Sequence, residues 1–90
     1  MAMPTARSDQ RITKEMAVEL VRPDASQFKE TAMVQNVSAR GMRVATEHVW
    51  HPGDPVLLSF PESGLRTEVR VIYCQRMENN RFAVGLELLA

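Results

Sequence analysis

Arginines are the residues best suited to bind an anion in this sequence, where they outnumber lysines nine to two. Arg7 and Arg11 stand four residues apart near the N-terminus. A guanidinium is planar and charged and carries paired N–H donors, so two of them could clasp a phosphate or a nucleobase edge. Arg66 and Arg70 repeat the spacing within an alternating apolar run, where we interpret them as a solvated strand face. The spacing alone is therefore a weak signal and needs a second motif beside it.

A second polar group lies between two apolar runs, in the sequence Asn36-Val37-Ser38-Ala39-Arg40-Gly41. Asn and Ser side chains can hydrogen-bond back to the backbone, and Gly41 can supply a positive φ, so a plain turn would explain the pattern. The same polar groups could instead meet a ligand. Chance rarely produces this combination from such a composition, so it is more specific than the arginine pair.

Signatures of catalysis are missing. The sequence has no glycine-rich phosphate loop, nucleophile elbow or dinucleotide-binding fingerprint, and its carboxylates occur singly. His48 and His51 could ligate a metal only if carboxylates joined them, and we interpret them as loop residues beside a partly buried Trp50. Cys74 is interpreted as a small apolar filler within a strand. We therefore expect no enzyme, no metal site and no cofactor.

The elements that must hold these residues are short strands separated by turn residues. Apolar residues alternate over residues 16–21, 28–34, 42–44, 56–60, 65–74 and 82–88. Six short strands with frequent turns are typical of an antiparallel barrel or sandwich, and closing a single small sheet removes its edges. We therefore expect an all-β fold, a six-stranded antiparallel β-barrel.

The first of these runs is ambiguous. Residues 13–21 could form a helix capped by Thr13, with Met16, Ala17, Leu20 and Val21 on one face. The alternation is cleaner than the helical spacing, and Pro23 follows directly, so we favour a strand.

The whole chain has the size and composition of one domain. Its 90 residues carry eleven basic and eleven acidic groups, and this zero net charge argues against binding to DNA or RNA. One cysteine excludes an internal disulfide framework, and no apolar run approaches the roughly 20 residues of a transmembrane helix. Residues 1–11 lack both a periodic apolar pattern and a signal-peptide core. We expect a cytoplasmic protein without membrane insertion, with residues 1–11 as a flexible arm and residues 12–90 as the barrel.

Taken in this order, the two motifs resemble the PilZ domain family. The family pattern is an N-terminal RxxxR followed along the chain by (D/N)xSxxG, and residues 7–11 and 36–41 match every defined position. The surroundings are similar as well: Ile12 after the second arginine, Pro52-Gly53-Asp54 before a strand, and Val84-Gly85-Leu86-Glu87-Leu88 near the end. The resemblance covers almost the entire chain.

The resemblance implies a bacterial receptor for the second messenger cyclic diguanylate (cyclic di-GMP), with a barrel of the split-barrel type that holds the messenger against its outside. Arg7 and Arg11 would then read guanine edges and neutralise phosphate, because a guanidinium fork matches guanine O6 and N7. Asn36 and Ser38 would hydrogen-bond to the other base, and Gly41 would let the ligand approach closely. Arg40 and Arg43 are further candidates for phosphate contacts.

The receptor would signal to a downstream protein through its arm, which would order when the ligand binds. An alternative is a PilZ-like protein-interaction barrel that does not bind the nucleotide, although such domains usually lack the arginines found here. A small enzyme is a third reading, without a catalytic constellation to support it. Family members often continue into a C-terminal helix, whereas this chain ends at Ala90 directly after the last expected strand, so we expect that helix to be short or absent.

Overall fold

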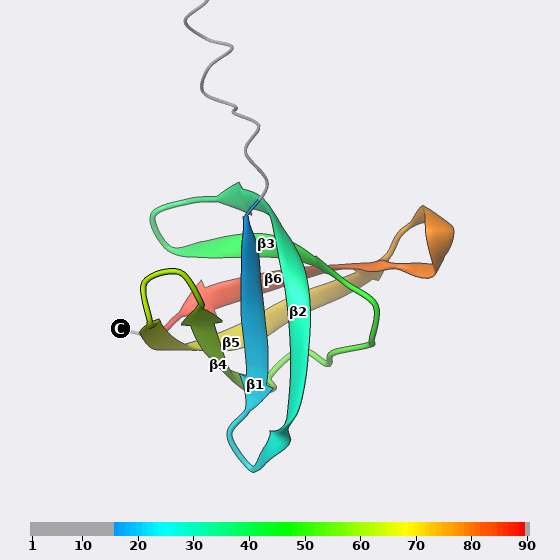
Figure 1. Ribbon diagram of the computed structural model, residues 1–90. Coiled ribbons are helices and arrows are strands. Elements are labelled where there is room, and N and C mark those ends of the chain that lie inside the picture. Colours follow the sequence, from blue (N-terminus) through cyan, green and yellow to red (C-terminus); the bar gives the residue numbers. More distant parts are fainter. Residues whose placement is uncertain (1–15, 90) are drawn as a thin grey trace, which may run out of the picture.

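Six β-strands make up almost all of the fold, as the computed structural model shows for residues 16–89 (Figure 1). They are β1 (Ala17–Arg22), β2 (Ala25–Val37), β3 (Gly41–Thr46), β4 (Pro55–Phe60), β5 (Leu65–Arg76) and β6 (Phe82–Leu88), with one 3-10 turn, η1 (Glu78–Asn80), between the last two strands. The β5–β6 hairpin, with η1 at its tip, projects from one side of the molecule. No helix within residues 16–89 is long and apolar enough to cross a membrane.

The strands close into a barrel in the order β1-β2-β3-β6-β5-β4, and β1 pairs with both β2 and β4. Every pairing is antiparallel. In Figure 1 the β1–β2 hairpin runs across β3, β6 and β5. The prediction of a closed six-stranded antiparallel barrel is confirmed, and closure leaves no edge strand free to pair with another chain.

The first apolar run is a strand, as its alternation predicted. Val18 and Leu20 are fully buried, while Ala17 is exposed and Glu19 and Val21 lie between these extremes. Pro23 and Asp24 form the turn to β2. The helical alternative is therefore wrong for Ala17–Arg22, because pairing with strands on both sides satisfies the backbone that a helix would have satisfied internally.

Alternate residues of the strands supply the core. Its fully buried members include Val18, Leu20, Val44, Leu58, Val69, Val71 and Val84. Trp50, from the connection between β3 and β4, joins them with only 1% of its surface exposed, so it is more deeply buried than we expected. Cys74 packs partly buried against this cluster, in agreement with its interpretation as an apolar filler.

The strand register shifts at three places: between Val21 and Arg22, beside the β1–β2 turn, and at two β-bulges farther along the chain. One extra residue, Gln35, lies between Val34 and Asn36 of β2, and another, Ile72, lies between Val71 and Tyr73 of β5. A bulge places two consecutive residues on the same side of a sheet. Tyr73 therefore faces outward, although strict alternation with Val69 and Val71 would have placed it in the core.

Candidate functional site

The two bulges lie at the two ends of one row of residues across four strands. Asn36 of β2 pairs with Arg43 of β3, Arg43 pairs with Gly85 of β6, and Gly85 pairs with Tyr73 of β5. The neighbouring row, which contains Val44 and Val84, is buried, so this row faces outward. Bulges often occur beside functional sites, where they redirect side chains. Here they turn an amide and an aromatic ring toward the same outer surface.

Gly85 makes room for the aromatic ring at the centre of this row. A Cβ built on Gly85 would lie 2.7 Å from two atoms of the Tyr73 ring, so any side chain there would displace the ring. Tyr73 thus packs directly on the backbone of β6 while remaining half-buried. Glycine in a strand interior often marks such a close approach. Gly85, within an apolar run, was therefore the signal in the sequence that could have indicated a packing partner such as Tyr73.

The turn between β2 and β3 carries the rest of the second motif. The Ser38 backbone N–H donates to the Gly41 carbonyl at 2.9 Å, and the Ser38 hydroxyl lies 3.4 Å from the same oxygen. The Leu88 N–H donates to the Arg40 carbonyl at 2.9 Å, which ties the turn to the end of β6. Ser38 therefore helps to shape the turn, as the plain-turn interpretation predicted, while its side chain remains exposed.

Gly41 does not have the positive φ that the plain-turn interpretation allowed. Within the described chain, the glycines with positive φ are Gly53 and Gly64, whereas Gly41 is an extended residue at the start of β3. It is needed for a different reason: a Cβ at this position would collide with the carbonyl oxygen of Leu86 and lie 3.1 Å from its carbon. The glycine permits a close approach of β3 to β6 rather than a bend.

These residues surround an open hollow of about 300 Å³ on the outside of the barrel. Its lining includes all five predicted residues that lie in the described chain: Asn36, Ser38, Arg40, Gly41 and Arg43. The structure adds Ile72 and Tyr73 from β5 and Glu87 from β6, which sequence reasoning missed. Met42, Gly85 and Leu86 complete the lining. A second segment of chain, distant in sequence, thus lines the same hollow as the residues of the motif.

Charges of both signs line the hollow. Arg40 is exposed, and Arg43 is held by a hydrogen bond from its Nε to the Gln35 side-chain oxygen at 3.1 Å. The bulge residue thus orients the guanidinium. Glu87 contributes a carboxylate to the same lining. With two guanidinium groups and one carboxylate, the hollow can bind a ligand that presents both anionic groups and hydrogen-bond donors.

Arg7 and Arg11 lie outside the residues that the structure describes, as does the predicted arm over residues 1–11. The described chain begins at Met16, whose carbonyl accepts a hydrogen bond from the Val34 N–H at 2.9 Å, beside the β2 bulge. Figure 1 shows the start of β1 and the β2–β3 turn at the same end of the barrel. Met16 is five positions after Arg11, and five chain steps can span at most about 17 Å.

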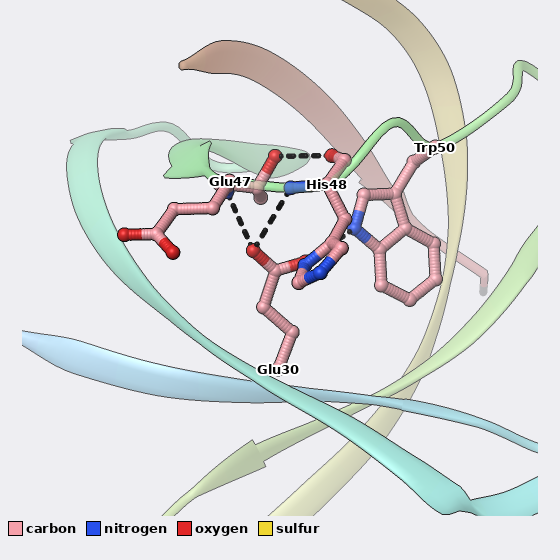
Figure 2. Close-up of polar contacts among 5 residues, drawn as sticks. Glu30, Glu47, His48 and Trp50 are labelled. Carbon is pink, nitrogen blue, oxygen red and sulfur yellow. Dashed lines mark hydrogen bonds and ion pairs between the residues drawn. The ribbon is translucent and has the colours of Figure 1, made fainter. Parts of the chain in front are cut away.

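A second polar cluster lies around Glu30, a residue that sequence reasoning missed among the single carboxylates. Its side chain is buried, and its Oε2 accepts from the Glu47 N–H at 2.6 Å and the His48 N–H at 3.3 Å (Figure 2). Its Oε1 accepts from the Trp50 indole N–H at 3.0 Å and lies 3.3 Å from the His48 Nδ1. Glu30 therefore fastens the β3–β4 connection to the barrel.

The histidines of this connection have structural partners. The His51 backbone N–H donates to Asp54 Oδ2 at 3.0 Å. Trp50, in the same connection, has the Arg22 guanidinium 5.2 Å from the centroid of its ring. Across residues 16–89, no three His, Cys, Asp or Glu side chains gather as a metal site would require. The interpretation of His48 and His51 as loop residues agrees with these contacts.

Comparison with known proteins addresses the family. No curated protein gives a significant match to the chain. The family model of the PilZ domain matches residues 5–90, which include both arginines of the first motif and the whole described barrel. The match extends over nearly the full sequence and agrees with the observed barrel. The chain belongs to the PilZ domain family.

Proposed function

We propose that this protein is a cytoplasmic bacterial receptor that binds cyclic di-GMP in the hollow on the outside of the barrel. The observation that supports this most strongly is the gathering of Asn36, Arg43 and Tyr73 along one outward row, beside the Ser38–Gly41 turn. The family match supplies the class of ligand, and the lining supplies groups suited to it.

Cyclic di-GMP offers two phosphates and two guanines, and each meets a suitable partner in this lining. Arg40 and Arg43 carry charges that would neutralise phosphate. The Tyr73 ring offers a surface for stacking a base, an interaction worth about 1–3 kcal/mol in single-stranded nucleic acid complexes. Asn36 can donate to or accept from a base edge. No step of bond making or breaking is needed, so the proposed role is recognition rather than catalysis.

Arg7 and Arg11 complete the proposed site by reaching the hollow from the start of β1. Their forks would meet guanine O6 and N7 or a phosphate, in addition to the guanidinium groups of Arg40 and Arg43. Binding would then order the N-terminal segment and change the surface that a downstream protein meets. The signal would be a population shift driven by contacts that exist only with ligand present.

Calorimetric titration of the full chain tests this proposal. We expect binding of cyclic di-GMP and much weaker binding of cyclic di-AMP. Arg11→Ala should weaken binding by about 1–3 kcal/mol, the value of one bidentate guanine contact. Arg66→Ala is the matched control, because Arg66 belongs to the other RxxxR spacing and is exposed on β5 outside the lining of the hollow. A chain that binds neither nucleotide would favour the protein-interaction barrel instead.

A further inference from the structure

Glu87 is an unexpected residue in the lining of an anion site. It lies on β6 two residues beyond Gly85, and its partners in register are Gly41 of β3 and Arg70 of β5. Its side chain is exposed and lines the same hollow as Arg40 and Arg43. Within residues 16–89, no hydrogen bond or ion pair joins its carboxylate to another side chain, and this includes Arg70 opposite it.

A carboxylate that makes no contact with the ligand would lower the affinity of this hollow for cyclic di-GMP. Cyclic di-GMP carries two negative charges, and like charges within a binding site reduce affinity. This repulsion is offset only if the ligand donates hydrogen bonds to the carboxylate. The question is therefore which part of the ligand offers donors to Glu87.

Guanine offers two adjacent donors on its Watson–Crick edge, the N1–H and the exocyclic 2-amino group. A carboxylate has two oxygens that accept hydrogen bonds and none that donate, so the two groups match as a pair. Hypoxanthine keeps the N1–H but lacks the amino group. Adenine presents a bare acceptor nitrogen at N1, which a carboxylate would repel.

The placement of Glu87 suits this edge. Residues two apart on a strand share a face and lie about 7 Å from each other, and the Tyr73 ring packs on Gly85, two residues before Glu87. A purine stacked on the Tyr73 ring would therefore lie on the same face of the sheet as the Glu87 carboxylate, about one strand repeat away. Gly41, opposite Glu87, has no side chain to obstruct it.

We propose that Glu87 is a specificity-determining residue, whose carboxylate accepts hydrogen bonds from the N1–H and 2-amino group of one guanine stacked on Tyr73. This inference rests on the proposed function and identifies the group that selects guanine. The arginine forks would read the O6 and N7 edge of guanine, while Glu87 reads the adjoining edge that carries the N1–H and 2-amino donors.

Titration of Glu87→Gln with cyclic di-GMP tests the inference, because the inference predicts weaker binding and simple charge repulsion predicts tighter binding. The glutamine amide keeps one acceptor oxygen but loses the charge and turns an NH₂ toward the second guanine donor, so binding should weaken about 10- to 100-fold, and the preference for cyclic di-GMP over the cyclic dinucleotide of inosine should shrink. Glu68→Gln is the matched control, since it removes one exposed carboxylate from the neighbouring strand outside the lining of the hollow. Circular dichroism of each variant checks that the barrel is still folded.

The contrary outcomes separate the two proposals. If Glu87→Gln binds cyclic di-GMP as tightly as Glu68→Gln does, or more tightly, the carboxylate makes no favourable contact with guanine, and the inference is wrong while the receptor function stands. If the unsubstituted chain binds no cyclic di-GMP, both proposals are overturned.

Discussion

At Gly41 the backbones of β3 and β6 approach so closely that no side chain fits between them. The sequence pattern correctly marked this glycine but suggested a positive φ, whereas the residue is extended and a Cβ would meet the Leu86 carbonyl. The sequence cannot distinguish a glycine needed for a positive φ from one needed where two backbones pack closely, because both appear as a glycine beside polar residues.

We predict that Gly41→Val destabilises the barrel by about 1–3 kcal/mol, the usual range for overpacking. Urea unfolding measures this change. Gly53→Ala is the control: Gly53 has φ +96 with open space around it, so its substitution isolates the conformational penalty, about 1 kcal/mol. Equal stability of Gly41→Val and the natural chain would show that β3 and β6 can separate here without cost.

Glu30 is a buried side chain, and both of its carboxyl oxygens accept hydrogen bonds. Replacing it with Gln keeps the shape but turns an NH₂ toward donors on Glu47, His48 or Trp50. We predict a loss of about 1–3 kcal/mol in unfolding free energy, because a buried donor is left unsatisfied. Thermal unfolding followed by Trp50 fluorescence measures it. Glu47→Gln, on an exposed neighbour, should leave the midpoint unchanged, and a Glu30→Gln midpoint equal to that control would refute the anchoring role.

At the scale of elements, the six strands could be predicted and the two bulges could not. Alternation of apolar residues is visible along each run, and it correctly favoured a strand over a helix at Ala17–Arg22. A bulge shifts the alternation by one residue, and no distinctive composition marks its position. The sequence therefore did not indicate that Ile72 and Tyr73 both face outward. The half of the site from β2 and β3 was predicted by its motif, whereas the half from β5 and β6 depends on pairing across distant strands.

The β5 bulge leads to a prediction about Tyr73. We expect Tyr73→Ala to weaken cyclic di-GMP binding by about 1–3 kcal/mol through loss of base stacking, while Tyr73→Phe, which keeps the ring, binds like the natural chain. Calorimetry measures both. Should the alanine variant bind with full affinity, β5 would not contribute to the messenger site.

At the scale of the whole molecule, the described strands form a closed barrel, and the proposed signal lies in residues 1–11. Ordering a backbone costs roughly 1–2 kcal/mol per residue, so only contacts made with the ligand can offset it. We predict that amide hydrogen exchange across residues 5–12 slows markedly when cyclic di-GMP is added, and that cyclic di-AMP leaves it unchanged. The same exchange with and without cyclic di-GMP would refute the switch and still allow simple binding.

The central claim is that cyclic di-GMP binds on the outer row formed by β2, β3, β6 and β5. An NMR titration of the ¹⁵N-labelled full chain tests it most directly, because each backbone amide reports separately. We predict that cyclic di-GMP shifts the amides of residues 36–43, Tyr73 and residues 85–87, and leaves the Glu30-anchored connection around His48 and Trp50 unchanged. A spectrum that does not change at millimolar ligand, or one whose changes are confined to that connection, would contradict the account.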